Sequence, residues 1–337
     1  MIRKNILTLL FLSLSVVAFC QVEIEEVSVT NLSDVNTAND EFVAVPFGEG
    51  IMFNGIGAKN SCDTCGYFHG LRFAKNKPEE DCGCSPSEKV AATNYPKKSN
   101  FNAPTFTSDS KTMYLTQNFK KAGGGETNER ESKLKIVMAQ ANDQNAWTNF
   151  VDVPFNMIDY ETAHPALTAD GQTMYFASDR PGGIGKMDIW KVTKQGDTWG
   201  EPVNLGAPIN SPGNEIFPSI SSNGALYYSS NKSGGNGNLD VYIASEESGS
   251  WSTSNLGAPF NSSADDLGYV ENADGESGYI TSNRSGGKGL DDLYCWKINK
   301  APVQLVVEDA NSTVRLPGSA INIVAVSYTH LTLPTKA

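Results

Sequence analysis

Six cysteines carry the clearest chemistry in this sequence, and four of them lie close together. Cys62 and Cys65 form a C-x-x-C pair, followed by Cys82 and Cys84 in a C-x-C pair. Four thiols at this spacing suit a tetrahedral zinc site, whereas in an oxidising compartment they would form two disulfides that hold a loop. Because four cysteines allow three pairings, we predict disulfides without assigning partners, and zinc and free thiols remain alternatives. Cys295, within a predicted strand, is expected to be a buried, unreactive thiol.

Side chains suited to catalysis are scarce. Of the 3 histidines, His330 lies in a C-terminal stretch that fits no repeat, and His164 occupies a repeat position that Phe217 holds in the next copy. We therefore expect His164 to be structural. The sequence contains no Gly-x-Ser-x-Gly motif, which marks the nucleophile turn of many serine hydrolases. These observations predict that the chain is not an enzyme and that it uses no cofactor.

Glycine-rich turns recur with polar residues beside them. Phosphate-binding loops need their glycines at the start of a helix, whereas these turns join predicted strands, which argues against nucleotide binding. Neighbouring polar pairs either form a binding rim or hydrogen-bond their own turns, and both alternatives stay open. The candidate rim residues are Asp179, Arg180, Asn231, Lys232, Asn283 and Arg284. Three recurring aspartates, Asp188, Asp240 and Asp291, are expected to accept hydrogen bonds from backbone amides between repeats.

The elements that must position these residues repeat with a period of 52. Trp147, Trp199 and Trp251 follow one another at this interval, and Asp-Gly or Asn-Gly turns recur in step with them. Such turns between short alternating runs are the strongest local signal for a β-hairpin. Each copy reads as four antiparallel strands, with residues 199–205 as the fourth strand of one copy. Repeats of this length and content predict an all-β fold, a β-propeller.

The ends of the repeat region predict how the ring closes. Residues 25–32 have no earlier strand to join, and the last copy, residues 265–298, lacks a fourth strand. Pairing the two would leave no open sheet edge. Front halves of the repeat begin at Glu41, Ala103, His164, Glu215 and Asp265. We therefore predict five blades; a sixth would need to lie within residues 76–100.

Composition and the two termini bear on location. The 337 residues carry a formal net charge of −12, which disfavours nucleic acid as a partner. Residues 1–20 have a positive start and an apolar run, the layout of a cleaved signal peptide, with lipidation of Cys20 as the alternative. No later stretch is long and apolar enough to span a bilayer as a helix. Residues 326–337 resemble translated sequencing-adapter read-through, so we expect the natural chain to continue past residue 325.

The repeat wording SDRPGGIGKMDIW resembles the TolB-type, WD-like propeller repeat, in the form found in OmpA-family cell-envelope proteins of Bacteroidetes-like bacteria. The resemblance implies a propeller over residues 21–300. Residues 301–325 resemble the start of a carboxypeptidase-regulatory-like β-sandwich. In that family a C-terminal OmpA-like domain holds peptidoglycan; that domain is not in this sequence, so no wall-binding residue is carried over.

Together these features predict an exported protein of the periplasm, associated with the outer membrane, that acts as a non-catalytic interaction or scaffold module. Its expected partners are envelope proteins, with peptidoglycan bound only through the further domain. A carbohydrate-binding or carbohydrate-cleaving propeller is one alternative. A TolB-like accessory to translocation is another, which shares the fold and differs only in its partner.

Overall fold

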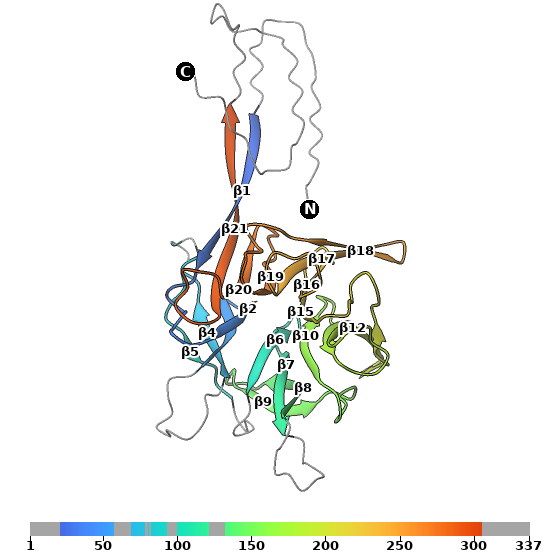
Figure 1. Ribbon diagram of the computed structural model, residues 1–337. Helices are drawn as coiled ribbons and strands as arrows, with labels where there is room; N and C mark the ends of the chain where they lie inside the picture. Colours follow the sequence, from blue (N-terminus) through green and yellow to red (C-terminus); the bar gives the residue numbers. More distant parts are fainter. Residues whose placement is uncertain are drawn as a thin grey trace, which may run out of the picture. The chain divides into compact units, whose positions relative to one another are not determined.

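The computed structural model describes residues 21–56, 69–77, 80, 82–92, 100–120 and 132–304, and within them all regular structure is β-strand. The strands form five sheets that follow one another along the chain (Figure 1). This confirms the predicted all-β fold with five blades. No helix in the described part of the chain is long and apolar enough to cross a membrane. The signal-peptide, Cys20, Cys62, Cys65, adapter and most of the sandwich predictions fall outside the described residues.

Four of the blades are local in sequence. Blade 1 contains β2 (Glu41–Phe47), β3 (Gly50–Ile56), β4 (His69–Lys75) and β5 (Glu88–Lys89). Blade 2 contains β6 (Phe101–Phe106), β7 (Thr112–Lys120), β8 (Ser132–Ala141) and β9 (Trp147–Asp152). Blade 3 contains β10 (Thr162–Leu167), β11 (Thr173–Ser178), β12 (Asp188–Gln195), β13 (Thr198–Trp199) and β14 (Val203–Asn204). Blade 4 contains β15 (Glu215–Ile220), β16 (Leu226–Ser230), β17 (Asp240–Glu247) and β18 (Ser250–Asn255).

Blade 3 departs from the prediction in its outer strand. The sequence suggested one strand over residues 199–205, but β13 and β14 pair with different parts of β12 and are separated by Gly200–Pro202. Proline has no backbone N–H, so a strand is easily interrupted there. The Gly200 N–H still donates to the Thr193 carbonyl at 2.9 Å, so the interruption is short.

Blade 5 is built from both ends of the propeller. It contains β19 (Asp266–Glu271), β20 (Ser277–Ser282), β21 (Asp292–Gln304) and β1 (Gln21–Asn31), in the spatial order β1-β21-β20-β19. The Leu32 N–H donates to the Leu293 carbonyl at 2.9 Å, just beyond the end of β1. The predicted closure by the N-terminal strand is thus confirmed.

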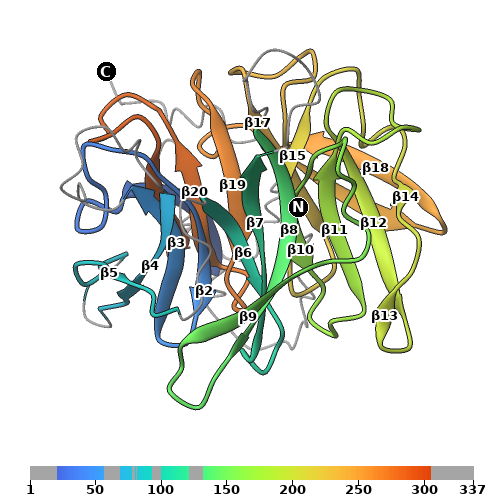
Figure 2. The same cartoon turned by 90° about the horizontal axis from the view of Figure 1, so that it is seen from below.

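The first strand of each blade lines the centre of the propeller. These inner strands, β2, β6, β10, β15 and β19, contact one another in turn and form a closed ring, which Figure 1 shows face-on and Figure 2 shows from the side. Each carries a β-bulge against its neighbour, and one residue of every bulge has a positive φ between 47° and 61°. The five residues are Val43, Ala103, His164, Phe217 and Gly268. The positive-φ residue of each bulge therefore marks the same position in every blade, and equivalent residues of different blades are found by counting from it.

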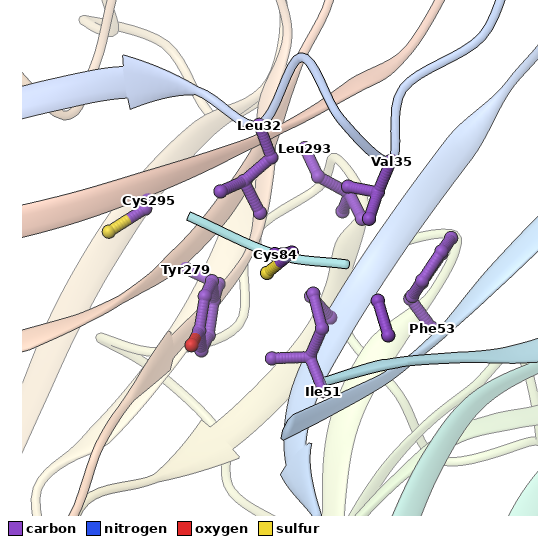
Figure 3. Close-up of a cluster of buried hydrophobic side chains, with 10 residues drawn as sticks. Leu32, Val35, Ile51, Phe53, Cys84, Tyr279, Leu293 and Cys295 are labelled. Carbon is purple, nitrogen blue, oxygen red and sulfur yellow. The ribbon is translucent and has the colours of Figure 1, made fainter. Parts of the chain in front are cut away.

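Two compact units can be distinguished: residues 27–298, and residues 1–26 with 299–337. Of the second unit the structure describes only the outer ends of β1 and β21. In the first unit, hydrophobic clusters fill the spaces between adjacent blades. Figure 3 shows one of them, in which Leu32, Ile51, Tyr279 and Leu293 join the last blade to the first.

Candidate functional site

A cleft of about 370 Å³ lies between blades 2 and 3. Its floor is apolar and its edges are polar. The floor includes Tyr114, Met138, Val153 and Trp199, and the edges include Thr107, Asp152, Lys194 and Asp197. This volume falls at the lower end of the range of small-molecule sites.

Trp199 forms one wall of this cleft. Its ring meets Tyr114 edge-on, with centroids 5.9 Å apart, and Phe155 edge-on at 6.1 Å. The Lys194 Nζ lies 5.4 Å from the centre of the same ring. Burial raises the pKa of Tyr114, so its hydroxyl is neutral at physiological pH. The cleft therefore offers a fixed aromatic wall beside groups that can form hydrogen bonds.

The equivalent space beside Trp147 is filled by a ring and by residues 90–92, whose backbone pairs with Trp147. Trp147, the equivalent tryptophan of blade 2, is 2% exposed and packs on Phe47 of blade 1, with ring centroids 6.1 Å apart. Phe47 lies four residues after the bulge residue Val43, and the same position in blade 2 is Thr107. A threonine cannot fill the space opposite Trp199 that Phe47 fills opposite Trp147.

The predicted binding rim is held by internal contacts, beginning with Arg180. Its guanidinium donates to the Phe155 carbonyl at 2.9 Å and lies 4.9 Å from the ring centre of Phe176 and 5.5 Å from that of Trp190. Burial lowers the pKa of Arg180 to about 10, so it remains charged at neutral pH. Arg180 therefore ties the turn of blade 3 to the loop that precedes β10.

The equivalent cations of blades 4 and 5 are used in the same way. The Lys232 Nζ donates to the Tyr228 hydroxyl at 2.8 Å and lies 3.9 Å from the ring centre of Tyr242, and burial lowers its pKa. Arg284 forms a 2.6 Å ion pair with the buried carboxylate of Asp266. Arg284 also donates to the Phe260 carbonyl at 2.6 Å, which ties its turn to the loop before β19 as Arg180 does in blade 3, whereas Lys232 contacts only its own blade.

The other three predicted rim residues accept hydrogen bonds from the backbone at the entrance to an inner strand. These bonds are Glu161 N to Asp179 Oδ1 at 2.6 Å, Asn214 N to Asn231 Oδ1 at 2.8 Å, and Asp265 N to Asn283 Oδ1 at 2.9 Å. Of the two alternatives, local hydrogen bonding is what the structure displays. A role of these six residues in binding a partner stays a prediction.

The recurring aspartates require two corrections. Asp188 accepts from the N–H groups of Ile184 and Gly185 in its own glycine-rich turn, rather than between blades. The equivalent residue in blade 5 is Asp292, which accepts from Lys288 N at 2.5 Å, and not the predicted Asp291. Each carboxylate fixes a turn by accepting two amides, as Asp240 does for Asn236 and Gly237.

The cysteines pair across the ring closure. Cys82 forms a disulfide with Cys295, 213 residues away, so the prediction of an unreactive thiol at Cys295 is wrong. The bond joins blade 1 to blade 5, and Cys82 is consequently not available as a thiolate ligand for zinc. Cys84 is a free, buried thiol in the same cluster, and burial raises its pKa to about 11 (Figure 3). Within the described residues no group of three or more His, Cys, Asp or Glu side chains is arranged to hold a metal ion.

His164 has a structural role, as predicted. Its ring stacks on Phe217 at 3.8 Å, and its Nδ1 accepts from the Phe217 N–H at 3.4 Å. In three other blades the bulge N–H bonds to a side chain of the preceding blade, as His164 N does to Thr116 Oγ1 at 2.7 Å. The corresponding residue for Phe217 is Ala177, which has no acceptor, so the imidazole supplies one. Burial lowers the pKa of His164 to about 3 and keeps it neutral.

A set of asparagine clasps, not predicted from the sequence, holds the links between blades. In four places a side-chain amide pairs with both the N–H and the carbonyl of one residue in a third strand, which ties the link between blades to the sheet. The pairs are Asn36 with Leu293, Asn156 with Ile136, Asn210 with Ile189, and Asn261 with Val241. The repeated sequences NLGAPIN and NLGAPFN end in Asn210 and Asn261, so their similarity could have predicted two of these clasps.

Comparison with known proteins finds similar folds and no similar sequence. No protein-family model matches the chain, and no curated protein matches it. A thermostable family-43 glycoside hydrolase is similar in structure at 16% identity and a TM-score of 0.46, covering 83% of this chain and 95% of that one. An exo-β-1,3-galactanase from Clostridium thermocellum gives 16% identity and a TM-score of 0.47, with 81% and 63% covered.

Peptidases also have similar structures. A puromycin-hydrolysing peptidase of Mycobacterium tuberculosis gives 12% identity and a TM-score of 0.39, covering 86% of this chain. The present chain spans 39% of that peptidase and 29% of two prolyl peptidases. The prediction that the chain is not an enzyme is therefore wrong as stated, because the structures it resembles include glycoside hydrolases and peptidases. At such identities the likeness concerns the fold alone and assigns no reaction to this chain.

Proposed function

We propose that the propeller is the partner-binding module of an exported cell-envelope protein of the OmpA-family type, located in the periplasm and associated with the outer membrane. The layout of residues 1–20 and the SDRPGGIGKMDIW repeat support this location and kinship. The net charge of −12 supports a protein partner over a nucleic acid.

The observation that carries this proposal is a set of exposed apolar side chains on one rim. Ile184 and Leu290, both in glycine-rich turns, are 48% and 73% exposed, and Ile158 in the loop before β10 is 67% exposed. The polar residues of the same rim bond internally, so the apolar tips are what the rim offers to a partner. Contiguous apolar groups with a polar surround mark protein-binding surfaces, and Ile158 and Ile184 both belong to blade 3 on this rim.

Site-specific crosslinking in cells tests this proposal. A photo-crosslinking residue is placed at Ile184 or Leu290 of the full chain, and the control is the same residue at Gln172, in the exposed β10–β11 turn at the other end of the strands. We expect adducts with envelope proteins from the first two positions only. Equal adducts from Gln172, or adducts only with cytosolic proteins, would contradict the proposal.

A further inference from the structure

The cleft between blades 2 and 3 has the composition of a site for an uncharged, hydroxyl-rich ring. Thr198 and Asp197 stand at its edge beside the aromatic wall of Trp199. A ligand that covers Trp199 must present an apolar face, and one that reaches Asp197 and Thr198 must present hydroxyl groups. A pyranose sugar does both, because its ring hydrogens form an apolar face and its hydroxyls donate and accept at the rim.

The charges of the cleft disfavour other ligand classes. An anion would meet the carboxylates of Asp152 and Asp197, with Lys194 beside the cleft and Lys135 already ion-paired with Asp152. A cation would meet Lys194 above Trp199 and would compete with Lys135, which forms a 2.6 Å ion pair with Asp152. A wholly apolar ligand would remove these polar groups from water without replacing their hydrogen bonds.

The junction between blades 1 and 2 shows how the equivalent space can be filled. Between blades 1 and 2, Phe47 and Phe106 pack on the equivalent tryptophan, Trp147, with ring centroids 6.1 and 5.8 Å away. Between blades 2 and 3, Thr107 replaces Phe47, and Tyr114 replaces Met52 in the wall. Blade 3 carries the same pair, Thr168 and Tyr175, so the threonine and tyrosine belong to the repeat and blade 1 is the exception. A space that lacks the phenylalanine ring and has a tyrosine beside it suits a sugar.

We infer that this cleft binds a neutral mono- or disaccharide, with a pyranose ring on Trp199 and its hydroxyls near Asp197, Thr198 and Lys194. The site lies where the β6–β7 and β12–β13 turns meet, at the opposite end of the strands from the glycine-rich turns. It does not depend on the proposed partner-binding function, and either can fail without the other.

Calorimetric titration of the full chain with cellobiose, chitobiose and β-1,3-galactobiose tests the inference. We expect at least one disaccharide to bind with a Kd of about 1 mM or tighter, corresponding to about −4 kcal/mol. Trp199→Ala should weaken binding by about tenfold or more, because it removes the stacking surface.

Thr107→Phe should abolish binding while the protein stays folded, since the new ring would fill the cleft as Phe47 fills the equivalent space between blades 1 and 2. The matched control is Trp251→Ala, the equivalent tryptophan of blade 4, which should leave the Kd unchanged. Circular dichroism and thermal unfolding check that each variant is folded. Absence of binding by all three disaccharides at millimolar concentration, unchanged binding by Thr107→Phe, or equal loss in Trp251→Ala would overturn the inference.

Discussion

Trp147 and Trp199 occupy equivalent positions in consecutive blades, yet Trp147 is buried and Trp199 lines a cleft. Trp147 is 2% exposed against the rings of Phe47 and Phe106, whereas Trp199 faces the smaller Thr107. The two tryptophans are alike in sequence; what differs is what the preceding blade presents, which for Trp147 includes the Phe47 ring and the backbone of residues 91–92. In a propeller the surroundings of a repeated residue are thus set by its neighbour in space, one repeat earlier in the chain.

The comparison predicts that replacement by alanine destabilises the protein far more at Trp147 than at Trp199. Trp147→Ala should lower the free energy of unfolding by about 4 kcal/mol, because it leaves a cavity among packed rings. Trp199→Ala should cost about 1 kcal/mol, since its ring is already partly in contact with water. Urea unfolding followed by circular dichroism measures both. Equal losses would show that the two junctions are packed alike.

Exchanging the residues that face the two tryptophans, Phe47 and Thr107, should make the packing of each junction more like that of the other. Phe47→Thr is expected to lower the free energy of unfolding by about 3 kcal/mol, because it opens a space beside Trp147. The reciprocal change Thr107→Phe should cost less, since the ring enters an existing cleft and only the turn hydrogen bonds of Thr107 are lost. Urea unfolding of the two variants compares their losses in the free energy of unfolding. A larger loss for Thr107→Phe than for Phe47→Thr would refute the equivalence of positions 47 and 107.

The junction between blades 3 and 4 extends the comparison to a polar contact. His164→Ala should cost about 2 kcal/mol, because the Phe217 N–H loses its acceptor and the Phe217 ring loses its stacking partner. Adding Ala177→Thr should recover part of this loss, since Thr116 and Thr281 accept from bulge N–H groups at the same position in other blades. Thermal unfolding of the single and double variants tests the rescue; a double variant no more stable than His164→Ala alone would exclude this replacement.

The same junction should respond weakly to pH. His164 has a pKa of about 3 when folded against a model value of 6.5, so the unfolded chain binds a proton that the folded one does not. Its contribution therefore lowers stability as pH falls below about 6.5, and amounts to about 0.8 kcal/mol between pH 8 and pH 6. His164→Gln keeps an acceptor without titrating, so its stability relative to the wild type should rise by that amount at pH 6. An unchanged difference between the two proteins at pH 8 and pH 6 would contradict a neutral, buried imidazole.

The repeat made the architecture predictable in detail. The period of Trp147, Trp199 and Trp251, with their hairpin turns, was enough for five blades and for closure by the first strand. These signals are local, and each copy reinforces the others. The asparagine clasps were within reach of the same reasoning, because Asn210 and Asn261 stand at matching positions.

The candidate site was harder to predict because it depends on contacts between copies. The cleft arises from Thr107 opposite Trp199, a pairing that no single repeat contains. Cys82 was grouped with nearby cysteines, but its partner Cys295 lies in the last blade and comes close only when the ring closes. Asp291 was predicted in place of Asp292 because the two aspartates are adjacent, and an alignment of the copies that is wrong by one residue puts Asp291 at the repeated position.

The composite last blade has a consequence for how the chain matures. β1 is synthesised first, yet its hydrogen-bonding partner β21 is among the last segments to be made. Until that moment the first strand has no sheet to join, and the interface between the first and last blades is exposed. A growing chain should therefore gain its resistance to proteases late and in a single step, when translation has passed β21.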